Sequence, residues 1–136
     1  MKPIRIILVM ALMAGLNLTM KAQSKSEGEK PQSVDKKKIE MYYFHTSRRC
    51  ATCNAVEEVS KETVKEYFAN NVTFKSINLD EEEGESLAKK LRVSGQTLLI
   101  VAGKEKIDLT NEGFMNAKNN PEKLKKIIKE KIDPLI

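Results

Sequence analysis

The two cysteines of this chain are separated by two residues, in the sequence Cys50-Ala51-Thr52-Cys53. Two thiols at this spacing can close a small disulfide ring, bind a metal ion as thiolates, or exchange disulfides with another molecule. The spacing is informative because the chain has no other cysteine. It predicts thiol–disulfide exchange, in which one thiolate attacks a disulfide and the second thiol resolves the mixed disulfide.

The cysteine pair lies between a predicted strand and a predicted helix. Residues 39–45 are rich in aromatic and apolar side chains, which predicts a strand buried on both faces. Residues 46–49 form a short polar loop. From about residue 50 to 68, apolar side chains recur at helical spacing, which predicts an amphipathic helix. Both thiols are therefore expected in the first turn of a helix that follows a buried strand.

This position predicts different roles for the two sulfurs. Unpaired backbone N–H groups and the positive end of the helix dipole favour a thiolate at the helix N-terminus, so we expect Cys50 to be the nucleophile. Cys53 lies on the same helical stripe as Val56 and is expected to be the more buried, resolving thiol. Arg48 and Arg49 would add positive charge if their side chains turn toward Cys50.

Three alternatives remain open from the residues alone. The pair could be a purely structural disulfide, although so small a ring restrains little of the unfolded chain. It could bind a metal ion together with His45, although three ligands are an incomplete set for structural zinc. It could also belong to a degenerate domain that only binds a partner. His45, the single histidine, is more simply a strand-end residue with a satisfied hydrogen bond than a ligand or a base.

The rest of the chain predicts an α/β domain. Two βαβ-like connections followed by a hairpin and a helix indicate a four-stranded mixed sheet flanked by helices, in the order β-α-β-α-β-β-α. The segment from residue 111 to 120 fits neither period. The remaining expected elements are a strand over 72–79, a helix from about 80 to 91, strands over 97–101 and 106–109, and a helix from Pro121.

Two stretches of this pattern, residues 42–53 and 91–101, resemble the thioredoxin family. The first matches its strand, loop and CxxC motif, and the second matches a short helix that gives way to a strand opening with Pro-Thr-Leu. The resemblance covers roughly residues 38–132. It implies a thioredoxin-like fold, thiol–disulfide exchange with an exposed first cysteine and a shielded second one, and a protein thiol or disulfide as partner. It implies no cofactor and no metal.

The chain departs from the family at three places. Trp-Cys-Gly-Pro-Cys is replaced by Arg-Cys-Ala-Thr-Cys, whose middle residues tune the redox potential in the family. The family's buried acid aligns with Phe44, so proton transfer at Cys53 would need another group, such as His45 or water. The family's cis-proline, which faces the disulfide and pairs with substrate backbone, aligns with Gln96 in Gly95-Gln96-Thr97. A non-proline cis bond costs about 2.5–4 kcal/mol, so we expect a trans bond there.

The N-terminal 22 residues predict a secretory signal peptide. Lys2 and Arg5 precede an apolar run from Ile6 to Leu16, and Ala22 offers a small residue for cleavage. The run is short for a membrane-spanning helix, although an uncleaved N-terminal anchor is the alternative. Residues 23–37 are polar and predict a flexible linker, so the folded domain would occupy 38–136. The domain is expected outside the cytoplasm, periplasmic or secreted, without stable membrane insertion after cleavage.

The charge of the predicted domain argues against nucleic acid as a partner. The whole chain has a net charge of +5, but three basic residues and no acid lie in residues 1–22. The remaining basic and acidic side chains nearly balance, so nucleic acid is not an expected partner. We expect a monomer that acts on a protein thiol or disulfide.

Overall fold

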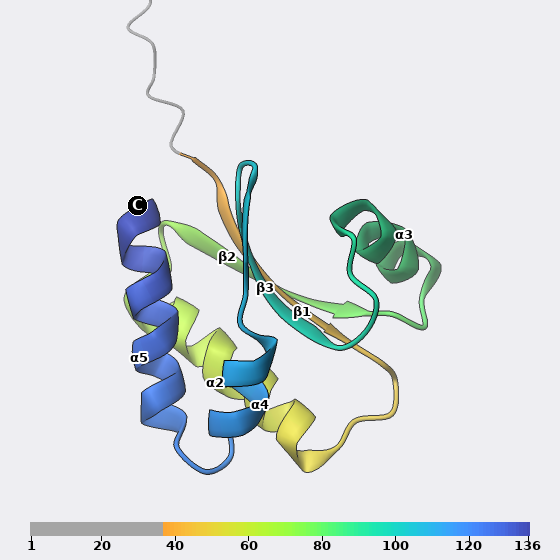
Figure 1. Ribbon diagram of the computed structural model, residues 1–136, viewed down its shortest axis with the longest axis horizontal. Coiled ribbons are helices and arrows are strands. Elements are labelled where there is room, and N and C mark those ends of the chain that lie inside the picture. The colour runs from red at the N-terminus through yellow and green to blue at the C-terminus, as the bar shows by residue number, and fades with distance from the viewer. Residues whose placement is uncertain (1–36) are drawn as a thin grey trace, which may run out of the picture. The chain divides into compact units, whose positions relative to one another are not determined.

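The computed structural model describes residues 37–136, so the predicted signal peptide and nearly all of the predicted linker lie outside the described residues. The described part contains one mixed sheet and its covering helices (Figure 1). The strands are β1 (Ile39–His45), β2 (Val72–Asn78), β3 (Thr97–Ala102) and β4 (Glu105–Asp108). The helices are α2 (Ala51–Tyr67), α3 (Glu82–Leu91), α4 (Thr110–Asn116), α5 (Pro121–Ile132) and the 3-10 helix η1 (Asp133–Leu135).

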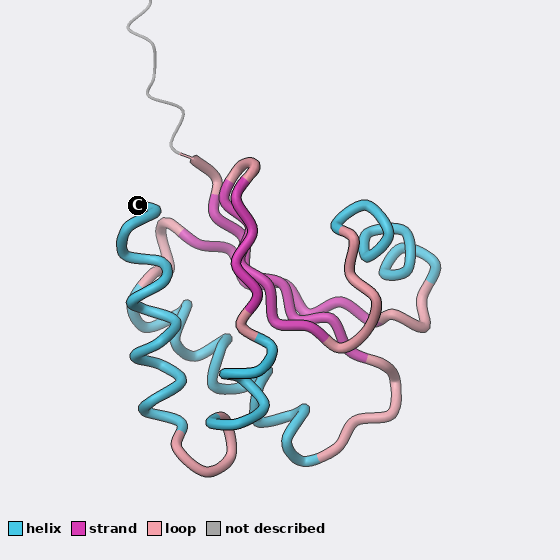
Figure 2. Tube along the Cα trace, viewed as in Figure 1, coloured by secondary structure: helices cyan, strands magenta, loops and turns pink. Residues whose placement is uncertain are grey.

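The sheet has the order β2-β1-β3-β4, with β1 and β3 in its centre. Strand β1 runs parallel to β2 and antiparallel to β3, and β3 and β4 form an antiparallel hairpin. The strands form one layer between the helices (Figure 2). The predicted four-stranded mixed sheet and α/β class are confirmed. The second predicted βαβ-like connection is wrong, because β3 joins the far side of β1 in the opposite direction. The ambiguous segment 111–120 contains most of α4, which adds one helix to the predicted order.

The helices cover both faces of the sheet. Helices α2, α4 and α5 lie on one face, and α3 lies on the other (Figure 1). Successive side chains of β1 point to opposite faces of the sheet, as they do along any strand. Met41 and Tyr43 belong to the larger core beneath α2, α4 and α5, whereas Tyr42 and Phe44 belong to a smaller core beneath α3. Strand β1 is therefore buried on both faces, as predicted.

Helix α2 begins where its sequence predicts. Cys50 is the N-cap, and its sulfur accepts a hydrogen bond from the backbone N–H of Cys53. The buried face of α2 includes Cys53, Val56 and Val59, which follow the predicted stripe. Tyr67, the last residue of α2, is 45% exposed.

Two further helix ends show how local sequence places the elements around the site. Helix α3 ends at Arg92, which adopts a left-handed conformation with φ of 57° and leads the chain back toward β3. Helix α5 begins after Asn120, whose side chain accepts a hydrogen bond from the backbone N–H of Lys123 at 3.2 Å. Pro121 occupies the first turn of α5, where a missing N–H costs nothing.

Candidate active site

Cys50 and Cys53 form a disulfide at the N-terminus of α2, with their Cα atoms 5.1 Å apart. The residues differ in access to solvent. Cys50 is exposed, whereas Cys53 is only 3% exposed and belongs to the buried face of the helix. A thiol of another molecule can therefore reach the sulfur of Cys50 far more easily than the sulfur of Cys53.

The electrostatic setting of Cys50 is that of a helix N-terminus. Its sulfur lies 3.2 Å from the backbone nitrogen of Cys53, which donates a hydrogen bond to it. The first turn of α2 contains no acidic side chain, so no carboxylate there opposes the positive end of the helix dipole. After reduction, the same N–H group and dipole would stabilise a thiolate on Cys50.

The residue before the motif, Arg49, makes contacts on the side of β1 that faces α2. Its guanidinium forms an ion pair with Glu57 of α2 and contacts the ring of His45. It also lies 3.4 Å from the hydroxyl of Ser76 on β2. The side chains of Arg49 and Glu57 are 28% and 19% exposed, so the pair is partly shielded from water. Glu57 therefore offsets part of the positive charge that Arg49 brings to the motif.

Glu57 was not among the residues singled out from the sequence, because its place in the helical pattern assigns it to the solvent face. A usable signal was present nonetheless. Glu57 lies four residues after Cys53, and residues at that spacing are neighbours on one helical face. In the structure this acid pairs with Arg49, the residue before the motif.

His45 is engaged within the protein at the end of β1, where it is 6% exposed. Its Nδ1 lies 3.0 Å from the carbonyl oxygen of Thr46, and its Nε2 contacts the guanidinium of Arg49. Nδ1 also lies 3.2 Å from Nε of Arg49, so both ring nitrogens have a partner within hydrogen-bonding distance. The ring is therefore held in place at the base of the active-site loop.

The loop before the motif is tied to the segment that follows β2. The backbone N–H of Ser47 donates to the Asp80 carboxylate at 2.7 Å, and the Asn78 amide donates to the Ser47 hydroxyl at 3.1 Å. Hydrogen bonds from the backbone and side chain of Ser47 lower the pKa of the Asp80 carboxyl. These contacts hold the loop that carries Arg48, an exposed residue whose carbonyl accepts a hydrogen bond from Thr46.

The segment Gly95-Gln96-Thr97 lies beside the buried cysteine. The described residues contain no cis peptide bond, so the predicted trans Gly95–Gln96 bond is confirmed. The side-chain oxygen of Gln96 lies 3.4 Å from the sulfur of Cys53, and its amide nitrogen lies 3.4 Å from the hydroxyl of Thr46. The Thr97 hydroxyl donates to the carbonyl of Gly95 at 3.0 Å, which fixes the entry to β3. The fold thus joins the motif, its preceding loop and the start of β3.

Two aromatic residues of β1, Tyr43 and Phe44, point to opposite faces of the sheet. Phe44 aligns with the buried acid of the thioredoxin family. Its side chain is fully buried in the core beneath α3 rather than on the face that α2 covers. Tyr43 is fully buried on the α2 face, and its hydroxyl has no hydrogen-bond partner among the described residues. Burial raises the pKa of Tyr43 to about 12, despite the opposing charge of Arg49. Tyr43 therefore stays neutral at ordinary pH.

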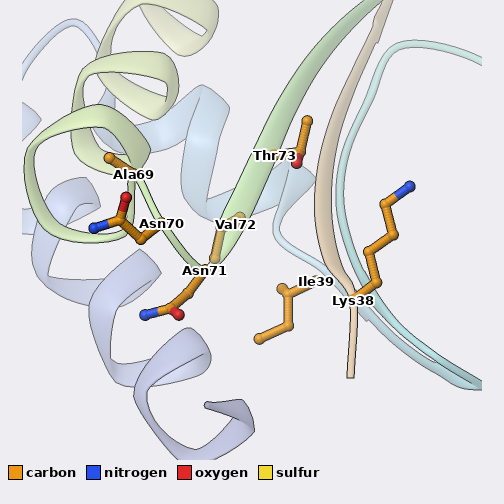
Figure 3. Close-up of a pocket in the computed structure, with 7 residues that line it drawn as sticks. All are labelled: Lys38, Ile39, Ala69, Asn70, Asn71, Val72 and Thr73. Atoms are coloured by element: carbon orange, nitrogen blue, oxygen red, sulfur yellow. The ribbon is translucent and has the colours of Figure 1, made fainter. Parts of the chain in front are cut away.

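A surface hollow of about 240 Å³ lies away from this site, at the start of β1 and the turn from α2 to β2. Figure 3 shows Ile39 and Lys38 on one side of it and Asn70 and Asn71 of the turn on the other. The active-site loop leaves the opposite end of β1, after His45. This hollow is therefore separate from the disulfide.

Across residues 37–136, no group of three or more His, Cys, Asp or Glu side chains is arranged to hold a metal ion. Within the same residues, no helix is both long and apolar enough to cross a membrane.

Comparison with known proteins shows the fold. No protein-family model and no curated protein sequence matches the chain. Among solved structures, it is similar to the germline-specific thioredoxin Deadhead of Drosophila melanogaster, with 16% identity and a TM-score of 0.50. That similarity covers 74% of this chain and 83% of Deadhead. Thioredoxin O2 of Arabidopsis thaliana in its oxidised state is similar at 23% identity, over 71% of this chain and 76% of its own, with a TM-score of 0.48.

The sheet topology, the helix that begins at the CxxC motif and the likeness to Deadhead together define a thioredoxin-like fold. The chain combines this fold with the motif Arg-Cys-Ala-Thr-Cys and with Gln96 in the segment before β3.

Proposed function

We propose that this chain is an exported thiol–disulfide oxidoreductase, or a thiol carrier for one protein partner, that works through reversible formation of the Cys50–Cys53 disulfide. The observation that carries the proposal is the asymmetry of the pair. An exposed sulfur at a helix N-terminus is joined to a buried sulfur one turn further along. In thiol–disulfide exchange the accessible sulfur is the one that reacts with another molecule, and the shielded sulfur can act as the leaving or resolving group within the protein.

The reaction can be followed atom by atom from the oxidised state. A thiolate of the partner attacks the sulfur of Cys50, the Cys50–Cys53 bond breaks, and its electron pair leaves on Cys53, which takes up a proton. A second thiolate of the partner then attacks the partner sulfur of the mixed disulfide. The products are a partner disulfide and a Cys50 thiolate. The reverse sequence begins with the Cys50 thiolate and ends with Cys53 as the resolving thiol.

The first test asks whether the pair cycles. The folded protein is equilibrated in buffers with defined ratios of reduced to oxidised dithiothreitol, and its free thiols are then alkylated and counted by mass. We expect a single two-electron transition and faster alkylation at Cys50 than at a free cysteine. A disulfide that does not form again after reduction would contradict the proposal.

The second test identifies the partner. Cys53→Ser removes the resolving thiol, so a mixed disulfide between Cys50 and the partner should accumulate. Cys50→Ser is the matched control, because it keeps one thiol but removes the exposed one, and it should trap nothing. Recovery of equal amounts of disulfide-linked protein by both variants would contradict the assigned roles.

The location of the protein is part of the proposal and rests on residues 1–22. If the segment is a signal peptide, the protein recovered from outside the cytoplasm should begin near residue 23. Fractionation of cells that express the full chain, followed by mass measurement of the N-terminus, tests this. Intact protein confined to the cytoplasm would refute export but not the redox activity.

A further inference from the structure

The side-chain amide of Gln96 has one orientation that satisfies its neighbours. The Thr46 hydroxyl donates its single hydrogen to the carbonyl of Arg48 at 2.9 Å, so its oxygen is left as an acceptor. The Gln96 group 3.4 Å from that oxygen must therefore be the NH2 group. This places the carbonyl oxygen of the amide, which only accepts, 3.4 Å from the sulfur of Cys53.

The contact between Gln96 and Cys53 differs in kind between the two redox states. In the disulfide, Cys53 has no hydrogen, so oxygen and sulfur meet without a hydrogen bond. In the reduced protein, Cys53 carries an S–H group, which is a weak donor aimed at an acceptor already in place. Cys53 is 3% exposed, so water offers little competition for this hydrogen bond.

We propose that Gln96 is a positioning residue that tunes the redox equilibrium of the pair by accepting a hydrogen bond from the Cys53 thiol in the reduced state only. The proposal rests on the proposed function, because it requires the disulfide to be reversible. The step is the exchange of the protein disulfide with a small dithiol. The Cys50–Cys53 bond breaks, both sulfurs gain hydrogen, and the dithiol becomes a cyclic disulfide. A bond made only by the product shifts this equilibrium toward the reduced protein.

The expected effect follows from the usual strength of a single hydrogen bond. Its loss in a buried place corresponds to about a fivefold change in an equilibrium constant. For a two-electron couple, a fivefold change is about 20 mV, because tenfold corresponds to 29.6 mV. The protein with Gln96 should have the higher, more oxidising potential.

Gln96→Met is the decisive variant, because methionine is about as long as glutamine but lacks the amide. We expect its exchange constant with reduced dithiothreitol to fall about fivefold. Gln96→Glu keeps an acceptor oxygen, so its constant should stay at or above the wild-type value. Ser94→Ala is the matched control, since Ser94 lies exposed in the same loop, and its constant should not change.

A spectroscopic measurement separates this role from a merely structural one. In a Cys50→Ser background, Cys53 is the only thiol, and its infrared S–H stretching band reports hydrogen bonding. We expect a lower frequency with Gln96 than with Gln96→Met.

The two proposals fail in different ways. If the wild-type disulfide cannot be cycled, the proposed function fails. If the wild type cycles but Gln96→Met matches Ser94→Ala in exchange constant, or leaves the S–H band unmoved, the role of Gln96 is overturned. Should Gln96→Met not fold, Gln96→Glu decides in its place, and an exchange constant below the wild-type value would overturn the proposal.

Discussion

Replacing Gly84 with alanine should destabilise this protein, although the same replacement usually stabilises a helix. Gly84 lies in the first turn of α3, which packs against the end of β2. A Cβ atom added there would lie 1.8 Å from the backbone oxygen of Asn78 and 3.2 Å from a methyl group of Ile77. Real Cβ contacts are not shorter than 3.0 Å, so the helix and the strand end would have to separate by more than about 1 Å.

The sign of the effect follows from two opposing magnitudes. Alanine gains about 1 kcal/mol over glycine in a helix interior. Overpacking typically costs about 1–3 kcal/mol, and a backbone carbonyl is less able to yield than a flexible side chain, so the upper end applies. The free energy of unfolding should therefore fall by about 2 kcal/mol, which corresponds to a Tm lower by roughly 8–16 °C for a domain of this size.

The assay is urea denaturation of the oxidised protein, followed by far-UV circular dichroism. Gly113→Ala is the matched control, because Gly113 is also a helical glycine, and its added Cβ would meet only side-chain atoms, at 3.3 Å and 3.4 Å. We expect the Gly113 variant to lie within about 1 kcal/mol of the wild type. A Gly84→Ala variant as stable as the wild type, or no less stable than the Gly113 variant, would refute the reasoning.

Three further changes test the electrostatics of the site and the sheet. Glu57→Gln removes the ion-pair partner of Arg49 and so leaves more positive charge beside the motif, and alkylation of reduced Cys50 at pH 7 should become faster. Glu40→Gln should lower the free energy of unfolding at pH 7 by about 1–2 kcal/mol, an amount discounted for solvent screening, and this difference should disappear as the pH falls toward 2. Asp80→Ala removes the acceptor for the backbone N–H of Ser47, so hydrogen exchange at that amide should accelerate.

The sign for Glu40 follows from the shift of its pKa. Burial alone would raise the pKa of this carboxyl, but hydrogen bonds from Lys75, Tyr42 and Lys38 outweigh burial and lower the pKa from 4.5 to about 2. A carboxyl with a depressed pKa stabilises the fold above its unfolded pKa, and this contribution is lost as the pH falls through the folded value. A difference between wild type and variant that grows on acidification would contradict this account.

The controls for Glu57→Gln and Asp80→Ala are substitutions of neighbouring acidic residues. Glu58→Gln removes an exposed charge next to Glu57 and should alter the alkylation rate at Cys50 far less, so equal effects would show that only overall charge matters. Glu83→Gln changes an exposed acid near Asp80, and exchange at the Ser47 amide should remain at the wild-type rate. Unchanged exchange in Asp80→Ala would show that the 2.7 Å contact does not order the loop.

Local patterns predicted the elements well where their period is strong. The aromatic run of β1 and the stripe of α2 predicted a buried strand followed by a helix that starts at the cysteines, because both signals are contained in a few adjacent residues. Helix α4 was missed because seven residues hold barely two turns, and Gly113 interrupts its helix-forming sequence. That glycine is explained only by the close approach of α4 to Val56 and Leu98.

The sequence by itself determined which chemistry is available to this protein. It places two cysteines at the start of a helix that follows a buried strand, at a spacing that allows a reversible disulfide. The tertiary structure alone decided which side chains surround the sulfurs. Gln96 lies 43 residues from Cys53 in the chain and reaches it only because β3 pairs with β1. Contacts of that kind depend on the sheet order and on the directions of side chains, and no local period in the sequence encodes either.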